Sequence, residues 1–302
     1  MRLKLAKKVG FCFGVRRAVN MAEEVLKKEG KANSLGSIIH NKQVVEDLSA
    51  RGLKVIKDID DADSGVLVIS SHGISPELSC EILKRSLKLV DTTCPFVRNA
   101  QKTARSLGEE GYTVIIVGDV NHPEVKALYD FAGEKAHVVK DASGLEALKL
   151  KPNKEIGVLS QTTQSMDNFL KVVKAIIDVK PKKLKVFNTI CKDAQVRQAA
   201  ARDISGEVEL MLVVGGKNSA NTKRLFEVCK NTLRKSYLIE TERDLKSQWF
   251  KGVSVVGITS GASTPDNIVR RVAKSVKSSA KNSGKERKVA NSTWQKRRTT
   301  SK

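Results

Sequence analysis

Three cysteines stand where a thiolate could bind a metal. Cys12, Cys94 and Cys191 each end an apolar run and begin a run with helical periodicity, in "GFCFGVRRAV", "DTTCPFVRNA" and "NTICKDAQVRQA". Each predicted helix carries arginine a few residues after its cysteine. A helix N-terminus with a nearby cation stabilises a thiolate. The sequence therefore predicts three equivalent thiolate positions.

The other two cysteines, Cys80 and Cys229, lie inside helical runs at apolar spacing, and we expect both in the core. Five cysteines are an odd number, and the N-terminus lacks the apolar stretch of a signal peptide. The chain also has no apolar run of membrane-spanning length. These features predict a cytoplasmic protein with reduced thiols rather than a disulfide framework.

Three converging thiolates could hold zinc or an iron–sulfur cluster. The spacings of 82 and 97 residues lack the paired C-x₂-C of structural zinc sites and the clustered cysteines of ferredoxins. The spacing thus leaves both metals open. A [4Fe–4S] cluster with three cysteine ligands leaves one iron open, which a substrate oxygen could bind as it would a Lewis acid.

Further polar residues stand at the predicted carboxyl ends of strands, where open parallel sheets bind ligands. They are His40, His72, His122 with Glu124, Thr162 and Thr163, Ser219 with Asn221, and Ser263. Glu124 also falls in the first turn of a predicted helix, where an acid is favourable as a cap. A catalytic and a capping role are both open for it.

The elements that must position these residues are short β-branched runs alternating with helical patterns. Predicted strands lie within 8–15, 32–41, 65–73, 87–95, 112–124, 136–141, 155–165, 184–192, 208–222, 236–242 and 253–265. This alternation is typical of βαβ units and parallel sheets. The pattern repeats about every 90 residues. We therefore predict an α/β protein of three pseudo-repeated lobes at 1–95, 96–190 and 191–276.

The formal charge of +22 is concentrated in part at the C-terminus. Residues 277–302 hold nine Lys/Arg and one Glu, which leaves about +14 on the rest. This segment has almost nothing to bury, and we predict a disordered basic tail. The charge suggests a nucleic-acid-binding protein as an alternative function. Aromatic residues are only 4%, however, and no basic-aromatic platform recurs to stack on bases.

Nine segments give the chain a family resemblance. They are, in order, "GFCFGVRRAV", "HN", "SSHG", "DTTCPFV", "NHPEV", "SQTT", "NTIC", "GGKNSANT" and "GASTPDNIV". From about residue 1 to 272 the chain resembles the 4-hydroxy-3-methylbut-2-enyl diphosphate reductase family of the non-mevalonate isoprenoid pathway. The resemblance implies a three-lobed trefoil around an oxygen-sensitive [4Fe–4S] cluster with an open iron site. It implies an iron–sulfur oxidoreductase that removes the allylic hydroxyl of (E)-4-hydroxy-3-methylbut-2-enyl diphosphate, giving isopentenyl and dimethylallyl diphosphates. It further implies ferredoxin or flavodoxin as the electron donor.

The resemblance also implies roles for single residues. The cluster ligands would be Cys12, Cys94 and Cys191. The diphosphate would contact His40, His72, His122, Ser219, Asn221 and Ser263, whose imidazoles, hydroxyls and amide can donate to phosphoryl oxygens. Glu124 matches the proton donor, and Thr162, with Thr163 one step away, matches a substrate-site hydroxyl that supports proton delivery. Ala220 stands where some members carry Ser. A zinc or other metal-thiolate enzyme acting on a phosphorylated substrate is the alternative within the enzyme class.

Overall fold

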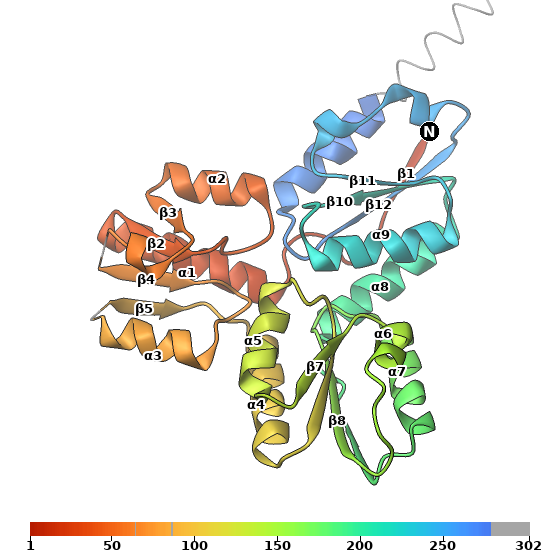
Figure 1. Ribbon diagram of the computed structural model, residues 1–302. Coiled ribbons are helices and arrows are strands. Elements are labelled where there is room, and N and C mark those ends of the chain that lie inside the picture. Colours follow the sequence, from red (N-terminus) through yellow and green to blue (C-terminus); the bar gives the residue numbers. More distant parts are fainter. Residues whose placement is uncertain (64, 86, 279–302) are drawn as a thin grey trace, which may run out of the picture. The chain divides into compact units, whose positions relative to one another are not determined.

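The computed structural model describes residues 1–63, 65–85 and 87–278 (Figure 1). The predicted tail, 277–302, lies outside these residues except for its first two positions. The described chain forms three separate four-stranded sheets, and all strand pairs in them are parallel. The predicted α/β class with three pseudo-repeated sheets is confirmed.

The first sheet has the order β3-β2-β4-β5. Its strands are β2 (Ala32–Leu35), β3 (Leu53–Ile56), β4 (Val66–Ile69) and β5 (Lys88–Asp91). The helices of this region are α1 (Phe13–Glu29), α2 (Lys42–Ala50) and α3 (Pro76–Lys84), with a 3₁₀ turn at Ile59–Asp61.

The second sheet has the order β7-β6-β8-β9. Its strands are β6 (Thr113–Val117), β7 (Ala136–Val139), β8 (Glu155–Ser160) and β9 (Lys183–Val186). The helices that precede and connect them are α4 (Pro95–Glu109), α5 (Pro123–Ala132), α6 (Ala142–Ala147) and α7 (Met166–Asp178).

The third sheet has the order β1-β12-β10-β11. Its strands are β1 (Arg2–Leu5), β10 (Leu210–Val214), β11 (Ser236–Ile239) and β12 (Val255–Ser260). Its helices are α8 (Lys192–Ser205), α9 (Ala220–Thr232) and the helical residues 266–278, with 3₁₀ turns at Glu242–Asp244 and Ser247–Phe250.

All three sheets share one strand order. Counted from β2, β6 and β10, each runs 2-1-3-4, and in the third sheet the fourth place is taken by the N-terminal strand β1. The repeat is therefore offset from the start of the chain, and residues 2–5 belong to the C-terminal sheet. The predicted first lobe, 1–95, is wrong in this respect. By internal contacts the described chain divides into two compact units, residues 1–10 with 197–278, and residues 11–196.

The sequence patterns did not predict the strands β1 and β3, and the strand predicted at residues 8–15 does not form. Both missed strands are at sheet edges, where half or more of the side chains are exposed and the sequence carries lysines. Residues 8–15, predicted as a strand, instead form an irregular connection and the start of α1, because Gly10 has φ of 81°. A left-handed glycine interrupts extended backbone.

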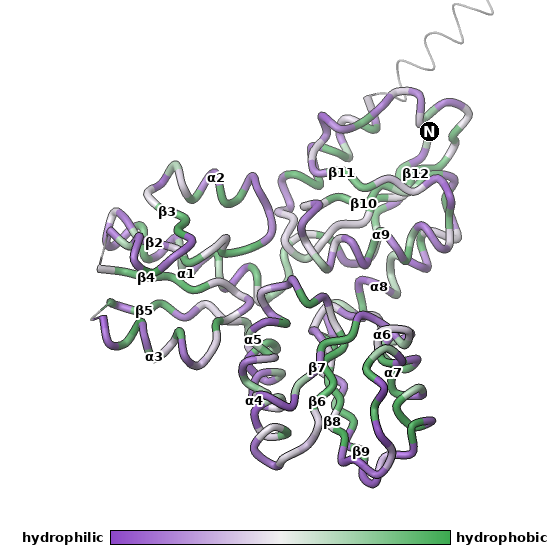
Figure 2. Tube along the Cα trace, viewed as in Figure 1, coloured by the Kyte–Doolittle hydropathy of each residue, from purple (hydrophilic) through white to green (hydrophobic). Residues whose placement is uncertain are grey.

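The core of each sheet is made of β-branched and leucine side chains on its central strands, with an amphipathic helix face against them. Figure 2 shows this as a green stretch at β8 and as alternating colours along α3 and α9. Among the residues described, no helix combines the length and the apolar character needed to cross a membrane.

Candidate functional site

Three of the four histidines of the protein lie together. The rings of His40 and His72 are stacked with centroids 4.4 Å apart, and His122 meets both edge-on at 5.2 and 5.1 Å. One nitrogen from each of the three rings lies within 4.8 Å of the others. Three imidazoles facing one point can bind an anion through N–H groups, or a metal through lone pairs.

The strand order explains why His40 and His72 meet, and His122 joins them from the second sheet. His40 and His122 follow the first strands of their repeats, β2 and β6, and His72 follows a third strand, β4. First and third strands are neighbours at the centre of a 2-1-3-4 sheet, and the connections leave them in opposite directions. Such a switch point is where open α/β sheets bind ligands.

His122 is held by the helix that it begins. It is the N-cap of α5, and its Nδ1 accepts a hydrogen bond of 3.2 Å from the backbone N–H of Glu124. This contact assigns the proton of the neutral ring to Nε2. His122 is buried, so its N–H faces other protein groups rather than bulk water.

Burial lowers the pKa of His72 well below its usual range, and the neighbouring His40 and His122 lower it further. A charged imidazole there is disfavoured because it loses water and faces two other rings that can carry positive charge. His72 is therefore neutral near pH 7, and a bound dianion would reverse part of this preference.

Glu124 is the buried acid of the site. It is 2% exposed, and burial raises the pKa of Glu124 to about 7, against the opposing effect of two hydrogen bonds from Thr162. The Thr162 N–H donates to Oε1 at 2.6 Å and the Thr162 hydroxyl donates to Oε2 at 2.9 Å. A carboxyl with a pKa near the working pH can both hold and release a proton.

The hydrogen bonds of the Glu124 carboxylate lie away from the end of α5, although Glu124 stands in the first turn of that helix. The N-cap of α5 is His122, and within the described chain the Glu124 carboxylate accepts hydrogen bonds from Thr162 on another loop. Thr163, the neighbouring candidate, is half-buried and has no such contact with Glu124 in this part of the chain.

The three predicted cysteines lie at the starts of helices, as the sequence indicated. Cys12 and Cys94 are the N-caps of α1 and α4, and Cys191 directly precedes α8. The Sγ of Cys12 accepts from the N–H of Val15 at 3.4 Å. None of the three is in a disulfide, and all are partly exposed.

The pKa values of Cys94 and Cys191 are both raised, chiefly by burial. Burial raises the pKa of Cys94, the N–H groups of Phe96 and Val97 oppose this, and charge on Cys12 or Cys191 raises it further. Burial likewise raises the pKa of Cys191, and the charge of Glu124 adds to the rise. At Cys94 and Cys191 the N–H groups at the helix starts therefore do not outweigh burial, contrary to the predicted stabilised thiolates. A bound cation would favour the thiolates.

A close approach of two helices explains why residue 14 is a glycine. A Cβ built on Gly14 would lie 2.4 Å from the Sγ of Cys94. Only a residue without a side chain lets α1 begin this close to the sulfur that begins α4.

Backbone contacts fix Cys94 and Cys191 in the same way. The N–H of Cys94 donates to the carbonyl of Ser71, and the N–H of Cys191 donates to the carbonyl of Thr162, at 3.0 and 2.8 Å. Two residues earlier, Thr92 and Thr189 donate their hydroxyls to strand-end carbonyls. Sequence reasoning missed these threonines, although the spacing T-x-C in "DTTC" and "NTIC" was a signal.

The remaining cysteines differ from each other. Cys229 is buried on α9, as predicted, and its pKa is raised by burial to about 11. Cys80 was predicted in the core and is exposed on α3. The prediction was wrong because α3 is short and only its opposite side, at Ile82, is fully buried.

Ser219, Asn221 and Ser263 belong to the unit of residues 1–10 and 197–278. Ser219 is the N-cap of α9, and the hydroxyl of Ser263 lies 3.5 Å from the hydroxyl of Ser219. Asn221 is buried, and both polar atoms of its side chain lack hydrogen-bond partners within the described chain. An amide in this state is suited to bind a polar ligand.

Known proteins are similar to this chain in both sequence and fold. The family model described as LytB protein matches residues 3–277. A curated 4-hydroxy-3-methylbut-2-enyl diphosphate reductase of Geobacter sulfurreducens is 46% identical, covering 90% of this chain and 97% of the relative. A reductase of the same name from Dehalococcoides mccartyi is 44% identical, covering 90% and 96%.

Two solved structures match as well. The E-1-hydroxy-2-methyl-but-2-enyl-4-diphosphate reductase of Plasmodium falciparum matches with a TM-score of 0.85 at 31% identity, covering 90% of this chain and 87% of that one. A second structure, (E)-4-hydroxy-3-methyl-but-2-enyl diphosphate reductase, matches with a TM-score of 0.65 at 40% identity, covering 92% and 100%. The resemblance seen in the nine segments is thus confirmed over almost the whole matched length, and the chain belongs to the LytB protein family of reductases.

Proposed function

We propose that this protein is a 4-hydroxy-3-methylbut-2-enyl diphosphate reductase. It would convert the (E)-allylic alcohol diphosphate to isopentenyl and dimethylallyl diphosphates. The observation that carries this proposal is the chain of contacts from Glu124 through Thr162 to Cys191, because it joins a proton source to a metal-binding thiol. The reaction consumes two electrons and two protons, breaks one C–O bond and releases water.

The residues present fit an iron–sulfur cluster. Three thiols outside any disulfide, each at the start of a helix, are a donor set suited to iron, and Gly14 keeps one approach to Cys94 clear of a side chain. We propose Cys12, Cys94 and Cys191 as the ligands. When bound, a [4Fe–4S] cluster supplies the electrons for the reduction. Ferredoxin or flavodoxin would deliver them, in the cytoplasm.

The histidines would bind the diphosphate. His40, His72 and His122 present ring N–H groups to one point, and a phosphoryl anion accepts several such hydrogen bonds. We propose the same role for Ser219, Asn221 and Ser263, on their match to the family motifs and on the unpartnered amide of Asn221. Binding at these residues would fix the allylic end of the substrate for reaction.

Glu124 would supply the proton to the leaving hydroxyl. Its pKa of about 7 leaves a large share of the carboxyl protonated near neutral pH. Thr162 orients the carboxyl through two hydrogen-bond donors. Its hydroxyl can also pass a proton to Glu124 when the carboxylate is protonated again. Water is a far better leaving group than hydroxide, so proton delivery and C–O cleavage are coupled.

Anaerobic turnover of the authentic diphosphate with a chemical or protein electron donor tests the function. We expect reduction to the two isomeric diphosphates and, in the same preparation, iron together with acid-labile sulfide. Because three clustered histidines can also bind zinc, metal analysis is part of the test. Stoichiometric zinc with neither iron nor turnover would favour the alternative, a zinc or other metal-thiolate enzyme acting on a phosphorylated substrate.

A further inference from the structure

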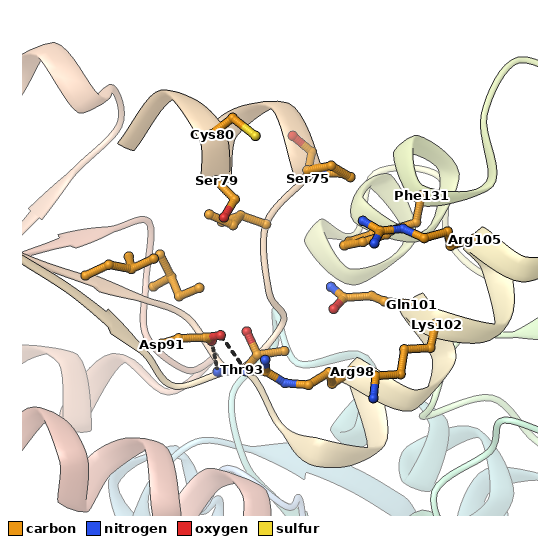
Figure 3. A pocket seen from close by; sticks show the side chains of 14 residues that line it. Ser75, Ser79, Cys80, Asp91, Thr93, Arg98, Gln101, Lys102, Arg105 and Phe131 are labelled. Atoms are coloured by element: carbon orange, nitrogen blue, oxygen red, sulfur yellow. Dashed lines mark hydrogen bonds and ion pairs between the residues drawn. The ribbon is translucent and has the colours of Figure 1, made fainter. Parts of the chain in front are cut away.

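A cavity lies in the unit of residues 11–196, apart from the residues of the site described above. Its volume is about 370 Å³, and Figure 3 shows it between α3, the ends of β4 and β5, α4 and α5. The three clustered histidines, Glu124 and Thr162 do not line it. It has the size of a small-molecule site, for which 300 Å³ is about the lower bound.

Three cations of α4 face this cavity. Arg98, Lys102 and Arg105 are spaced four and three residues apart, so they share one side of the helix. Arg98 pairs with Asp91. Within the described chain neither Lys102 nor Arg105 has a carboxylate partner, and the guanidinium of Arg105 lies 4.8 Å from the ring centre of Phe131. The cavity therefore carries uncompensated positive charge.

Gln101, on the same side of α4, supplies a buried donor. It is 6% exposed, its Nε2 has no hydrogen-bond partner among the described residues, and its amide turns into the cavity in Figure 3. A Cβ on Gly73 would lie 2.4 Å from that Nε2, so the glycine leaves room for the amide. A buried N–H left unpaired is destabilising, and an acceptor on a ligand would remove that cost.

The opposite wall is apolar. Ile69, Ile74 and Leu89 line it, together with Ser79 of α3. A free inorganic anion would satisfy the cations and leave this wall in contact with water. A ligand with an acidic head and an apolar chain would satisfy both sides.

We propose that this cavity binds a small phosphorylated molecule with an apolar chain. A phosphoryl group has enough acceptor oxygens for Lys102, Arg105 and Gln101 together, whereas the chain packs on the isoleucines and Leu89. The proposal goes beyond the reductase function and does not depend on it.

Cys80 provides a readout that is separate from catalysis. It is exposed and lines the cavity, so a bound ligand shields its thiol. The experiment alkylates anaerobically prepared, full-length holoprotein with a maleimide and follows the Cys80 peptide by mass spectrometry. The probe is hexyl phosphate, with inorganic phosphate and hexanol as separate arms. At ten times its Kd, hexyl phosphate should slow alkylation of Cys80 about tenfold, by mass action.

Two double variants carry the test. Lys102→Gln/Arg105→Gln removes the uncompensated cations and should raise the Kd at least tenfold, about 1.4 kcal/mol. Lys171→Gln/Lys174→Gln makes the same charge change on exposed positions of α7 and should leave the Kd unchanged. Thermal melts of both variants verify that they are folded. Gln101→Glu, which places a negative charge at the head-group position, should abolish protection.

Three outcomes would overturn the proposal. One is an unchanged alkylation rate with millimolar hexyl phosphate. Another is equal protection in the wild type and in the Lys102→Gln/Arg105→Gln variant, which would place the ligand elsewhere. The third is equal protection by hexanol, which would remove the phosphoryl head from recognition. Since turnover is not measured, a failure here leaves the reductase assignment untouched, and the reverse also holds.

Discussion

Thr162 donates two hydrogen bonds to Glu124, one to each carboxylate oxygen, while its own carbonyl accepts from the N–H of Cys191. A single residue thus holds the buried acid and one of the three cysteines proposed as ligands. The positions of the Glu124 carboxylate and of Cys191 are therefore coupled through Thr162. A substitution that moves one of them should also move the other.

Replacing Glu124 tests the proton source. Glu124→Gln keeps the size and most hydrogen bonding but cannot deliver a proton, so turnover should fall at least about a hundredfold. Iron content and substrate affinity should stay near those of the wild type, and Glu124→Asp should lie between the two. Near-normal turnover of the Gln variant, measured anaerobically, would remove Glu124 from the mechanism.

The raised pKa of Glu124 also predicts a pH dependence of stability. Because the folded pKa lies above the unfolded value of 4.5, the stabilising contribution is full below pH 4.5 and is lost as the pH rises through about 7. Across that window Glu124→Gln should gain stability relative to wild type by roughly 3 kcal/mol, since each pKa unit is worth about 1.4 kcal/mol. Unfolding midpoints between pH 4.5 and 8 measure it. Glu24→Gln, an exposed change on α1, should show no such trend.

The two threonines of "SQTT" can be separated by their pH–rate profiles. Thr162→Val removes the hydroxyl donor to Glu124 but keeps the N–H, so the carboxylate is less stabilised and its pKa rises further. The limb of the profile in which activity falls with rising pH should move to higher pH, with a lower maximum. Thr163→Val should leave the profile in place. A shift in the Thr163 variant alone would mean that the wrong threonine was assigned.

Gly14 should be required for metal binding rather than for folding. Gly14→Ala favours the helix α1 by about 1 kcal/mol in propensity, yet its Cβ would press on the Sγ of Cys94. Overpacking of this kind costs about 1–3 kcal/mol, or about ten- to a hundredfold in cluster affinity. The measurement is iron and sulfide content beside a thermal melt. Gly65→Ala is the control, because open space surrounds its Cβ position.

Substitution of the cysteines should separate ligands from the rest. Cys94→Ser should lose the cluster, since a hydroxyl replaces thiolate poorly toward iron, whereas Cys80→Ser on the exposed side of α3 should keep it. Cys229→Ser should lower stability alone, because that thiol is buried in the core. Iron counts per chain, taken before any exposure to air, decide the point, and a full cluster in Cys94→Ser would contradict the three-thiol model.

Much of the site could be predicted because of where the chain changes from strand to helix. His40 and His72 follow the two central strands of the first sheet, so parallel topology places them at one edge, whereas His122 follows a strand of the second sheet. The cysteines were found by their helix starts. What could not be predicted depends on contacts across loops: the partner of Glu124 is 38 residues away, and the residue against Gly14 begins another helix. The edge strands β1 and β3 were missed because they bury too little to show an apolar pattern.

The place of β1 in the third sheet has a consequence for how the protein is made. Its partner β12 is about 250 residues later in the chain, as the contact of Gly10 with Ser260 also shows. During synthesis, the strands of the first and second sheets are complete long before β12 leaves the ribosome, whereas the N-terminal residues must wait for almost the entire chain. Until then, Cys12 and its helix α1 are joined to a segment that has no sheet to pair with. Completion of the third sheet is thereby expected to be the last step of folding.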